Sequence, residues 1–264
     1  MHKKISAAVL IILLYSGVSF ADHPLITDGA ETLDKGEFVA ELNSEFSFGK
    51  KKVEGVSIKE RQAEIAALIT FGVMDNVEIV LELPYRWIRE KENGGNTFRA
   101  DGTGDVELEV KWRFYGNDDL HLALKPSISF PTGSAKKELG NGRISYGLMF
   151  LATREIEPFQ LSFHLNIGYM HNEFKLREDR EENRKDIWHV SLAAEKSIIK
   201  DLSAVTNIGI ERNPEKGSNT HPAFILGGLI YSISKNLNVD FGVKGGLTKT
   251  EPDIAYLAGL VWSF

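Results

Sequence analysis

Apolar and polar side chains alternate one by one along most of the chain. Beyond Val77, for example, Ile79 and Leu81 alternate with Glu78 and Glu82. Because successive side chains of a β-strand point to opposite faces of its sheet, this period of two predicts strands with one apolar and one charged face. The chain therefore has the pattern of an all-β protein.

Twelve segments carry this alternation, with turn residues and loops between them. Their expected ranges are 37–48, 59–71, 77–89, 106–114, 120–130, 143–153, 159–170, 186–196, 202–211, 220–233, 237–248 and 253–264. Connections after even-numbered segments are short, whereas most of those after odd-numbered segments are long. This rhythm is typical of an outer-membrane barrel, so we predict a transmembrane antiparallel up-and-down β-barrel of about twelve strands.

A soluble β-sandwich is the alternative fold, because it contains a similar number of strands. The fourth segment argues against it, since its polar face consists of Glu107, Glu109, Lys111 and Arg113. These charges would be costly in a soluble core, and the apolar face opposite them would promote aggregation in water. A wall between lipid and a polar lumen tolerates both faces.

The last segment, 253–264, has an apolar face that ends in aromatic residues. It resembles the carboxyl-terminal signal that the outer-membrane assembly machinery recognises, and we expect Tyr256, Trp262 and Phe264 to form that assembly signal. We also expect this strand to pair with the first strand, 37–48, because closure leaves no backbone edge exposed to lipid.

The amino-terminal residues divide into two parts before the barrel. Residues 1–21 begin with lysines, continue in an apolar run and end in Ser-Phe-Ala, as a cleaved secretory signal peptide does. Residues 22–36 are polar and rich in turn residues, and we expect a periplasmic lead-in there. The barrel would then occupy residues 37–264.

Composition restricts the partners. The formal net charge is −6 and becomes more negative once Lys3 and Lys4 leave with the signal peptide, which excludes a nucleic-acid partner. The chain has no cysteine, so it has no disulfide framework. Its other apolar runs are too short for a membrane helix. We expect contacts with outer-membrane lipid, the assembly machinery and a small-molecule solute, in a Gram-negative bacterium.

Three stretches resemble a known family. They are DHPLITDGAETLDKGEFVAELNSEF at 22–46, GTGDVELEVKWRFYG at 102–116 and SISFPTGSAKKELGNG at 127–142. They are similar to the outer-membrane transporter family labelled "meta-pathway of phenol degradation", and the resemblance covers essentially the whole mature chain. It implies an outer-membrane barrel that passes small aromatic or hydrophobic compounds. The family's motifs name no catalytic residues.

The polar positions that face the lumen are the candidate functional residues. We expect the constriction to lie among Glu82, Arg86, Glu109, Lys111, Arg113, Lys125, His164, Asp240 and Lys244. Carboxylates outnumber bases at the inward positions, which favours passage of cations or neutral polar solutes. The alternative is a lumen filled by matched ion pairs, in a non-conducting barrel with a structural or adhesion role.

Two further expectations concern how the lumen is arranged. Across the third and fourth segments, Glu78 and Glu82 should face Arg113 and Lys111. Arg86 should face Glu107 and Glu109. The long loops 90–104, 132–142 and 171–185 should gate or restrict the passage.

An outer-membrane hydrolase is a further alternative, because His189 and Ser191 resemble the His-x-Ser of a twelve-stranded outer-membrane phospholipase. That family continues with Asn-Gly and places the pair toward lipid. Here Leu192 and Ala193 follow, and the strand phase points the pair inward. We therefore expect no enzyme activity.

No cofactor or metal is expected. Asp101 and Asp105 flank a Gly-rich stretch with oxygen ligands at alternate positions, but the bidentate Glu of a calcium loop is missing. His121, His164 and His189 face inward on three different strands, and a metal site would need them at one height.

Overall fold

The structure is a computed structural model that describes residues 23–264 except 54–55, 93–94 and 96. The predicted signal peptide, residues 1–21, lies outside the described residues. The strands are β1 (Phe38–Val53), β2 (Val56–Met74), β3 (Val77–Glu92), β4 (Thr97–Thr103), β5 (Val106–Gly116), β6 (Leu120–Phe130), β7 (Ser145–Ile156), β8 (Leu161–His171), β9 (Asp186–Ile199), β10 (Leu202–Glu211), β11 (Ala223–Ser234), β12 (Leu237–Gly246) and β13 (Ile254–Ser263). The helices are η1 (Ala135–Lys137), η2 (Glu157–Phe159) and α1 (Arg177–Glu182).

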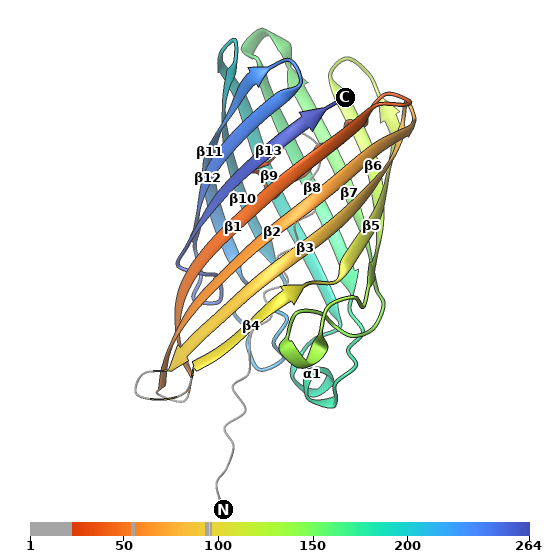
Figure 1. The fold of residues 1–264 in the computed structure, drawn as a ribbon. Helices are drawn as coiled ribbons and strands as arrows, with labels where there is room; N and C mark the ends of the chain where they lie inside the picture. Colours follow the sequence, from red (N-terminus) through yellow and green to blue (C-terminus); the bar gives the residue numbers. More distant parts are fainter. Residues whose placement is uncertain (1–22, 54–55, 93–94, 96) are drawn as a thin grey trace, which may run out of the picture.

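The strands form one closed antiparallel barrel (Figure 1). Closure occurs between β1 and β13, in a register that runs from Val39 opposite Ser263 to Phe48 opposite Ile254. β4 and β5 share one position in the wall, because β5 pairs with the first half of β3 and β4 with its second half. The wall therefore has twelve strand positions, which confirms the predicted fold.

Two segments differ from the expected loops. β3 continues to Glu92 and pairs with β4, so most of 90–104 is a hairpin that extends the wall. The loop 171–185 contains the short helix α1. Among the described residues, no helix is long and apolar enough to cross a membrane.

The barrel has a turn end and a loop end. The carboxyl terminus and the short turn after β2 lie at the turn end, drawn at the top of Figure 1, and α1 lies at the loop end. Outer-membrane barrels place short turns in the periplasm and long loops outside, so the turn end is periplasmic.

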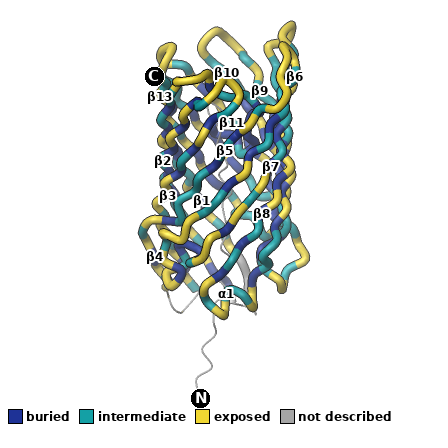
Figure 2. The backbone as a smooth tube through the Cα atoms, turned by 90° about the vertical axis from the view of Figure 1, so that its right-hand side faces the viewer, coloured by how far each residue is buried: buried dark blue, intermediate teal, exposed yellow. Residues whose placement is uncertain are grey.

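Apolar side chains cover the outside of the wall. Leu42 is 51% exposed and Phe71 is 45% exposed, whereas Glu41 and Lys111 on the inner face are buried. Figure 2 shows the resulting alternation of buried and exposed positions along the strands. This distribution inverts that of a soluble protein, as a lipid-facing surface requires.

Residues 23–36, which we call the inner segment, lie within the barrel up to Leu33, and residues 34–36 are exposed at the turn end. Thr27, Asp28 and Ala30 are at most 1% exposed. This differs from the periplasmic lead-in expected for 22–36. The physical reason is that the polar groups of the inner segment are satisfied by side chains of the lumen wall, which are distant in the sequence.

Candidate functional site in the barrel lumen

Hydrogen bonds to the wall hold the backbone of the inner segment. Asn207 of β10 accepts two of its N–H groups at 2.8 and 3.1 Å. Thr153 of β7 accepts the N–H of Ala30 at 2.9 Å, and Glu78 of β3 accepts that of Leu33 at 2.8 Å. Because the partners come from well-separated strands, the inner segment crosses the lumen instead of following one wall.

A buried cluster of five charged groups is centred on Asp28. Its carboxylate lies 3.1 Å from Lys111 Nζ and 2.8 Å from Lys125 Nζ. Lys111 also lies 3.2 Å from Glu78, and Lys125 lies 3.0 Å from Glu109. All five side chains are nearly inaccessible, so removal of one partner would leave an uncompensated buried charge at a cost of about 3 to 5 kcal/mol.

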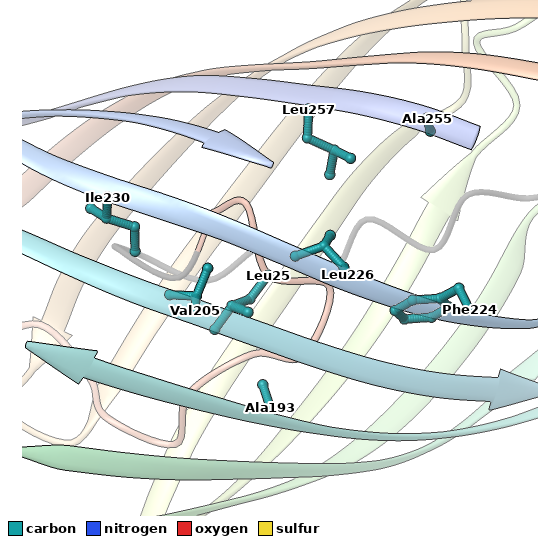
Figure 3. Packing of buried hydrophobic residues seen from close by; sticks show 8 residues of the cluster. All are labelled: Leu25, Ala193, Val205, Phe224, Leu226, Ile230, Ala255 and Leu257. Carbon is teal, nitrogen blue, oxygen red and sulfur yellow. The ribbon is translucent and has the colours of Figure 1, made fainter. Parts of the chain in front are cut away.

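An apolar cluster lies on the other side of the lumen. Leu25 of the inner segment belongs to a cluster with side chains of β9, β10, β11 and β13 (Figure 3). The cluster consists of Leu25, Ala193, Val205, Phe224, Leu226, Ile230, Ala255 and Leu257. The apolar cluster thus lies on β9, β10, β11 and β13, whereas the wall residues of the charge cluster around Asp28 lie on β3, β5 and β6.

The predicted charge pairings are correct only in part, since Lys111 lies opposite Glu78. Glu82 lies opposite Glu107 in the register of β3 with β5, and does not face Lys111. Arg86 forms an ion pair with Glu64, its direct neighbour on β2. The reason is β4, which the sequence did not predict: it takes the place beside the second half of β3, so Arg86 does not meet β5.

The candidates on β12 pair near the closure of the barrel. Asp240 forms an ion pair with His23 of the inner segment. Lys244 lies 2.9 Å from Glu45 and 3.3 Å from Glu251, and its Nζ is 5.7 Å from the centre of the Phe224 ring. These contacts bring β1, β12 and the inner segment together.

The remaining candidates, His164 and Arg113, lie in different parts of the barrel. His164 is buried, and its Nδ1 lies 2.9 Å from Thr153 Oγ1. Arg113 instead donates to the backbone carbonyl of Asp75 at 2.7 Å, in the turn between β2 and β3. It therefore belongs to the periplasmic rim and not to the middle of the lumen.

The carboxylates considered for calcium have other partners. Asp105 accepts the N–H groups of Gly133 and Asn141 at 2.9 and 2.7 Å, and so anchors the loop after β6. Asp101 accepts the hydroxyl of Tyr85 on the outer face at 3.1 Å. The two carboxylates thus serve different parts of the wall.

One group of side chains has the composition of a metal site. Donor atoms of Glu31, His121 and Glu155 all lie within 4.8 Å of one another. The group was not predictable, because Glu31 belongs to the segment expected outside the barrel. Of the three inward histidines considered from the sequence, only His121 belongs to this group.

The pair considered for hydrolysis lies in the lumen wall, as the strand phase predicted. His189 and Ser191 are buried, and His189 Nε2 lies 2.9 Å from Ser191 Oγ. Its Nδ1 is 3.9 Å from Glu211 Oε2, which exceeds hydrogen-bond distance. The pair therefore does not meet lipid.

In the loop after β8, side chains join the two ends of the connection. Lys185 Nζ lies 2.6 Å from the Glu173 carboxylate, and His171 Nε2 lies 3.3 Å from it. These hydrogen bonds, that of Lys185 foremost, lower the pKa of Glu173. The contacts hold the loop end of β8 and β9 together.

Comparison with known proteins supports this description. The family model described as "Putative MetA-pathway of phenol degradation" matches residues 26–264. No curated protein sequence matches the chain.

Several solved barrels are similar in structure. The COG4313 outer membrane channel from Pseudomonas putida F1 superposes with a TM-score of 0.70 at 12% identity, over 94% of this chain and 100% of that chain. The KdgM porin gives 0.54 at 10% identity, over 85% and 99%. The Ralstonia pickettii toluene transporter TbuX gives 0.52 at 10% identity, over 88% and 90%. At these identities the likeness establishes the shared fold. By its family match, this outer-membrane β-barrel belongs to the family described as "Putative MetA-pathway of phenol degradation".

Proposed function

We propose that this protein is a passive outer-membrane channel for small molecules and that the inner segment narrows its lumen. The observation that carries the proposal is a closed barrel with a charged inner wall, and a single extended segment crosses its lumen. The names of the similar barrels, a channel, a porin and a transporter, support the same function.

Lumen-facing polar atoms indicate where water would pass. Within the described part of the chain, Glu41 Oε1, Asn43 Oδ1 and Asp240 Oδ2 are buried and have no protein hydrogen-bond partner. Buried oxygens of this kind require water, because a buried polar group without a hydrogen-bond partner costs roughly 1 to 3 kcal/mol of stability. We infer a hydrated route beside the inner segment, along β1 and β12.

We further propose that small aromatic compounds are among the solutes. A phenol-sized molecule has an apolar ring and a polar edge, which match the apolar cluster and the charge cluster of the lumen. The apolar cluster contains Phe224 and Leu226, and the charge cluster contains Lys111 and Glu109. The family description names phenol degradation, and the similar TbuX is titled a toluene transporter.

Flux into proteoliposomes tests this function. We expect benzylammonium to enter faster than benzoate, because carboxylates predominate on the inner wall. Glu41→Gln should reduce that preference by roughly threefold, since it removes an inward carboxyl group beside the route. Glu37→Gln, at an exposed position before β1, is the matched control and should leave the preference unchanged. The proposal would be contradicted if neither probe entered protein-containing liposomes faster than protein-free liposomes.

A plugged barrel is the second candidate function, and the anchoring of the inner segment favours it. Asp28, held by two lysines, would then block the lumen permanently. The two candidates differ in conductance, since only the channel conducts with the inner segment in place.

For the hydrolase alternative, Ser191 is 2% exposed, so we propose no catalytic role.

A further inference from the structure

Six basic side chains gather on the outside of the barrel at the loop end of β1 to β4. All are exposed, and we call them the basic patch: Lys50, Lys59, Arg61, Arg89, Lys91 and Arg99. The chain as a whole is acidic, with a formal net charge of −6. A concentration of cations on one part of its outer surface therefore requires an explanation.

The strand register places these cations in two adjacent rows. Arg61 lies opposite Arg89, and Arg89 lies opposite Arg99, so one row crosses β2, β3 and β4. Lys59 lies opposite both Lys50 and Lys91 in the next row outward.

Like charges directly opposite each other destabilise a sheet. Among the side chains that the structure describes between residues 23 and 264, which exclude 51–56, 93–94 and 96, no ion pair neutralises any member of the basic patch. Asp101 is the one carboxylate that shares a groove with the three arginines, so cations outnumber anions there, and an anionic partner would balance them.

The position of the rows relates them to the membrane. The outward residues of β3 are apolar from Val77 to Trp87, a length close to the roughly 9 to 11 residues that a spanning strand needs. Arg89 is the next outward position. On β2 the same change occurs between Ala63 and Arg61. The arginine row therefore lies at the outer border of the hydrocarbon layer, at the level of lipid headgroups.

A groove joins the arginine row to the apolar surface. Its volume is about 360 Å³, and the three arginines of the basic patch line it together with Phe46, Phe48 and Trp87. Asp101 also lines the groove, where its carboxylate accepts the Tyr85 hydroxyl at 3.1 Å. The groove thus has a cationic part toward the outside and an aromatic part toward the membrane.

We propose that the basic patch binds lipopolysaccharide, the phosphorylated glycolipid of the outer leaflet. Its phosphate groups would lie on Arg61, Arg89 and Arg99, because guanidinium groups bind phosphate oxygens in bidentate fashion. An acyl chain would lie along the aromatic part of the groove. Basic residues at a membrane surface attract anionic lipid headgroups in the same way.

Binding of purified lipopolysaccharide to the full-length barrel in detergent tests the proposal. The test variant replaces the three arginines of the row, and the control variant removes the same charge from three exposed arginines elsewhere: R61Q/R89Q/R99Q against R143Q/R154Q/R177Q. Heat-modifiable gel mobility verifies that both variants are folded. We expect at least a tenfold loss of affinity for the test variant and less than a twofold loss for the control.

Three outcomes would overturn the proposal. The first is equal affinity of the two folded variants for lipopolysaccharide. The second is wild-type binding of dephosphorylated lipopolysaccharide as tightly as of the native lipid, because the phosphates would then contribute nothing. The third is equally tight binding of phosphatidylglycerol micelles, which would identify a surface for any anionic lipid. If refolding of the test variant fails, measurement of each single arginine variant replaces it, with a loss of at least twofold expected for each.

Discussion

The Asp28→Asn variant is expected to conduct at least roughly twice as well as the wild type in planar bilayers, because it frees the inner segment. Asp28 bridges Lys111 and Lys125, and the neutral amide cannot balance either ammonium group. Loss of one partner from a buried ion pair costs about 3 to 5 kcal/mol. The remaining anchors are the contact of His23 with Asp240, the apolar packing of Leu25 and hydrogen bonds to wall residues. Those hydrogen bonds are worth about 0.5 to 1.5 kcal/mol each.

Asp28 thus supplies a large part of the free energy that holds the inner segment, and its replacement should raise both conductance and current noise. Asp34→Asn is the matched control, because Asp34 is exposed in the same segment. Unchanged conductance of the folded Asp28→Asn variant would mean that the inner segment does not depend on this charge cluster.

Deletion of Phe264 is expected to impair assembly more than transport. Its ring lies 4.8 Å from that of Trp262 and 5.5 Å from that of Phe38, and its N–H donates to the Phe38 carbonyl at 2.9 Å. Two aromatic pairs contribute about 1 to 3 kcal/mol together, or roughly a tenfold change in an equilibrium. These contacts lie where β13 joins β1, so we expect roughly a tenfold smaller folded fraction by heat-modifiable gel mobility.

The control for this deletion is Phe159→Ser. Phe159 is also aromatic and is 64% exposed at the same end of the barrel, in η2, away from the closure. Barrels of the deletion variant that do insert should conduct like the wild type. Normal insertion of the deletion variant would contradict the assembly role inferred from the sequence.

The wall of the barrel was predictable because the alternation of side chains is a local property. The alternation within each strand shows which side chains face the lumen, so the inward positions of Glu109, Lys111 and Lys125 followed directly from the sequence. Closure followed too, since an unpaired edge is not tolerated in lipid.

Contacts between distant residues were not predictable. The inner segment contains ordinary turn residues, and its partners are up to 217 positions away, as between His23 and Asp240. The register error at Arg86 has a related cause. The sequence beyond Glu92 is rich in glycine and was expected to be a loop, but β3 and β4 pair there as a hairpin. β4, and not β5, therefore lies beside the second half of β3.

The basic patch was visible in the sequence only as single residues. Arg61, Arg89 and Arg99 are far apart in the chain, and each is unremarkable alone. Only the register of β2, β3 and β4 places them side by side. Both the neighbour of Arg86 and the arginine row of the basic patch therefore depend on how the strands pair, which the periodicity of the sequence does not specify.

The most direct test of a channel narrowed by its inner segment is the single-channel conductance of the wild type and of a variant that lacks residues 24–35. We predict a measurable conductance for the wild type and one several-fold larger for the deletion variant. A non-conducting wild type with a conducting deletion variant would identify a plugged barrel. Equal conductance of the two proteins would contradict any restriction of the lumen by the inner segment.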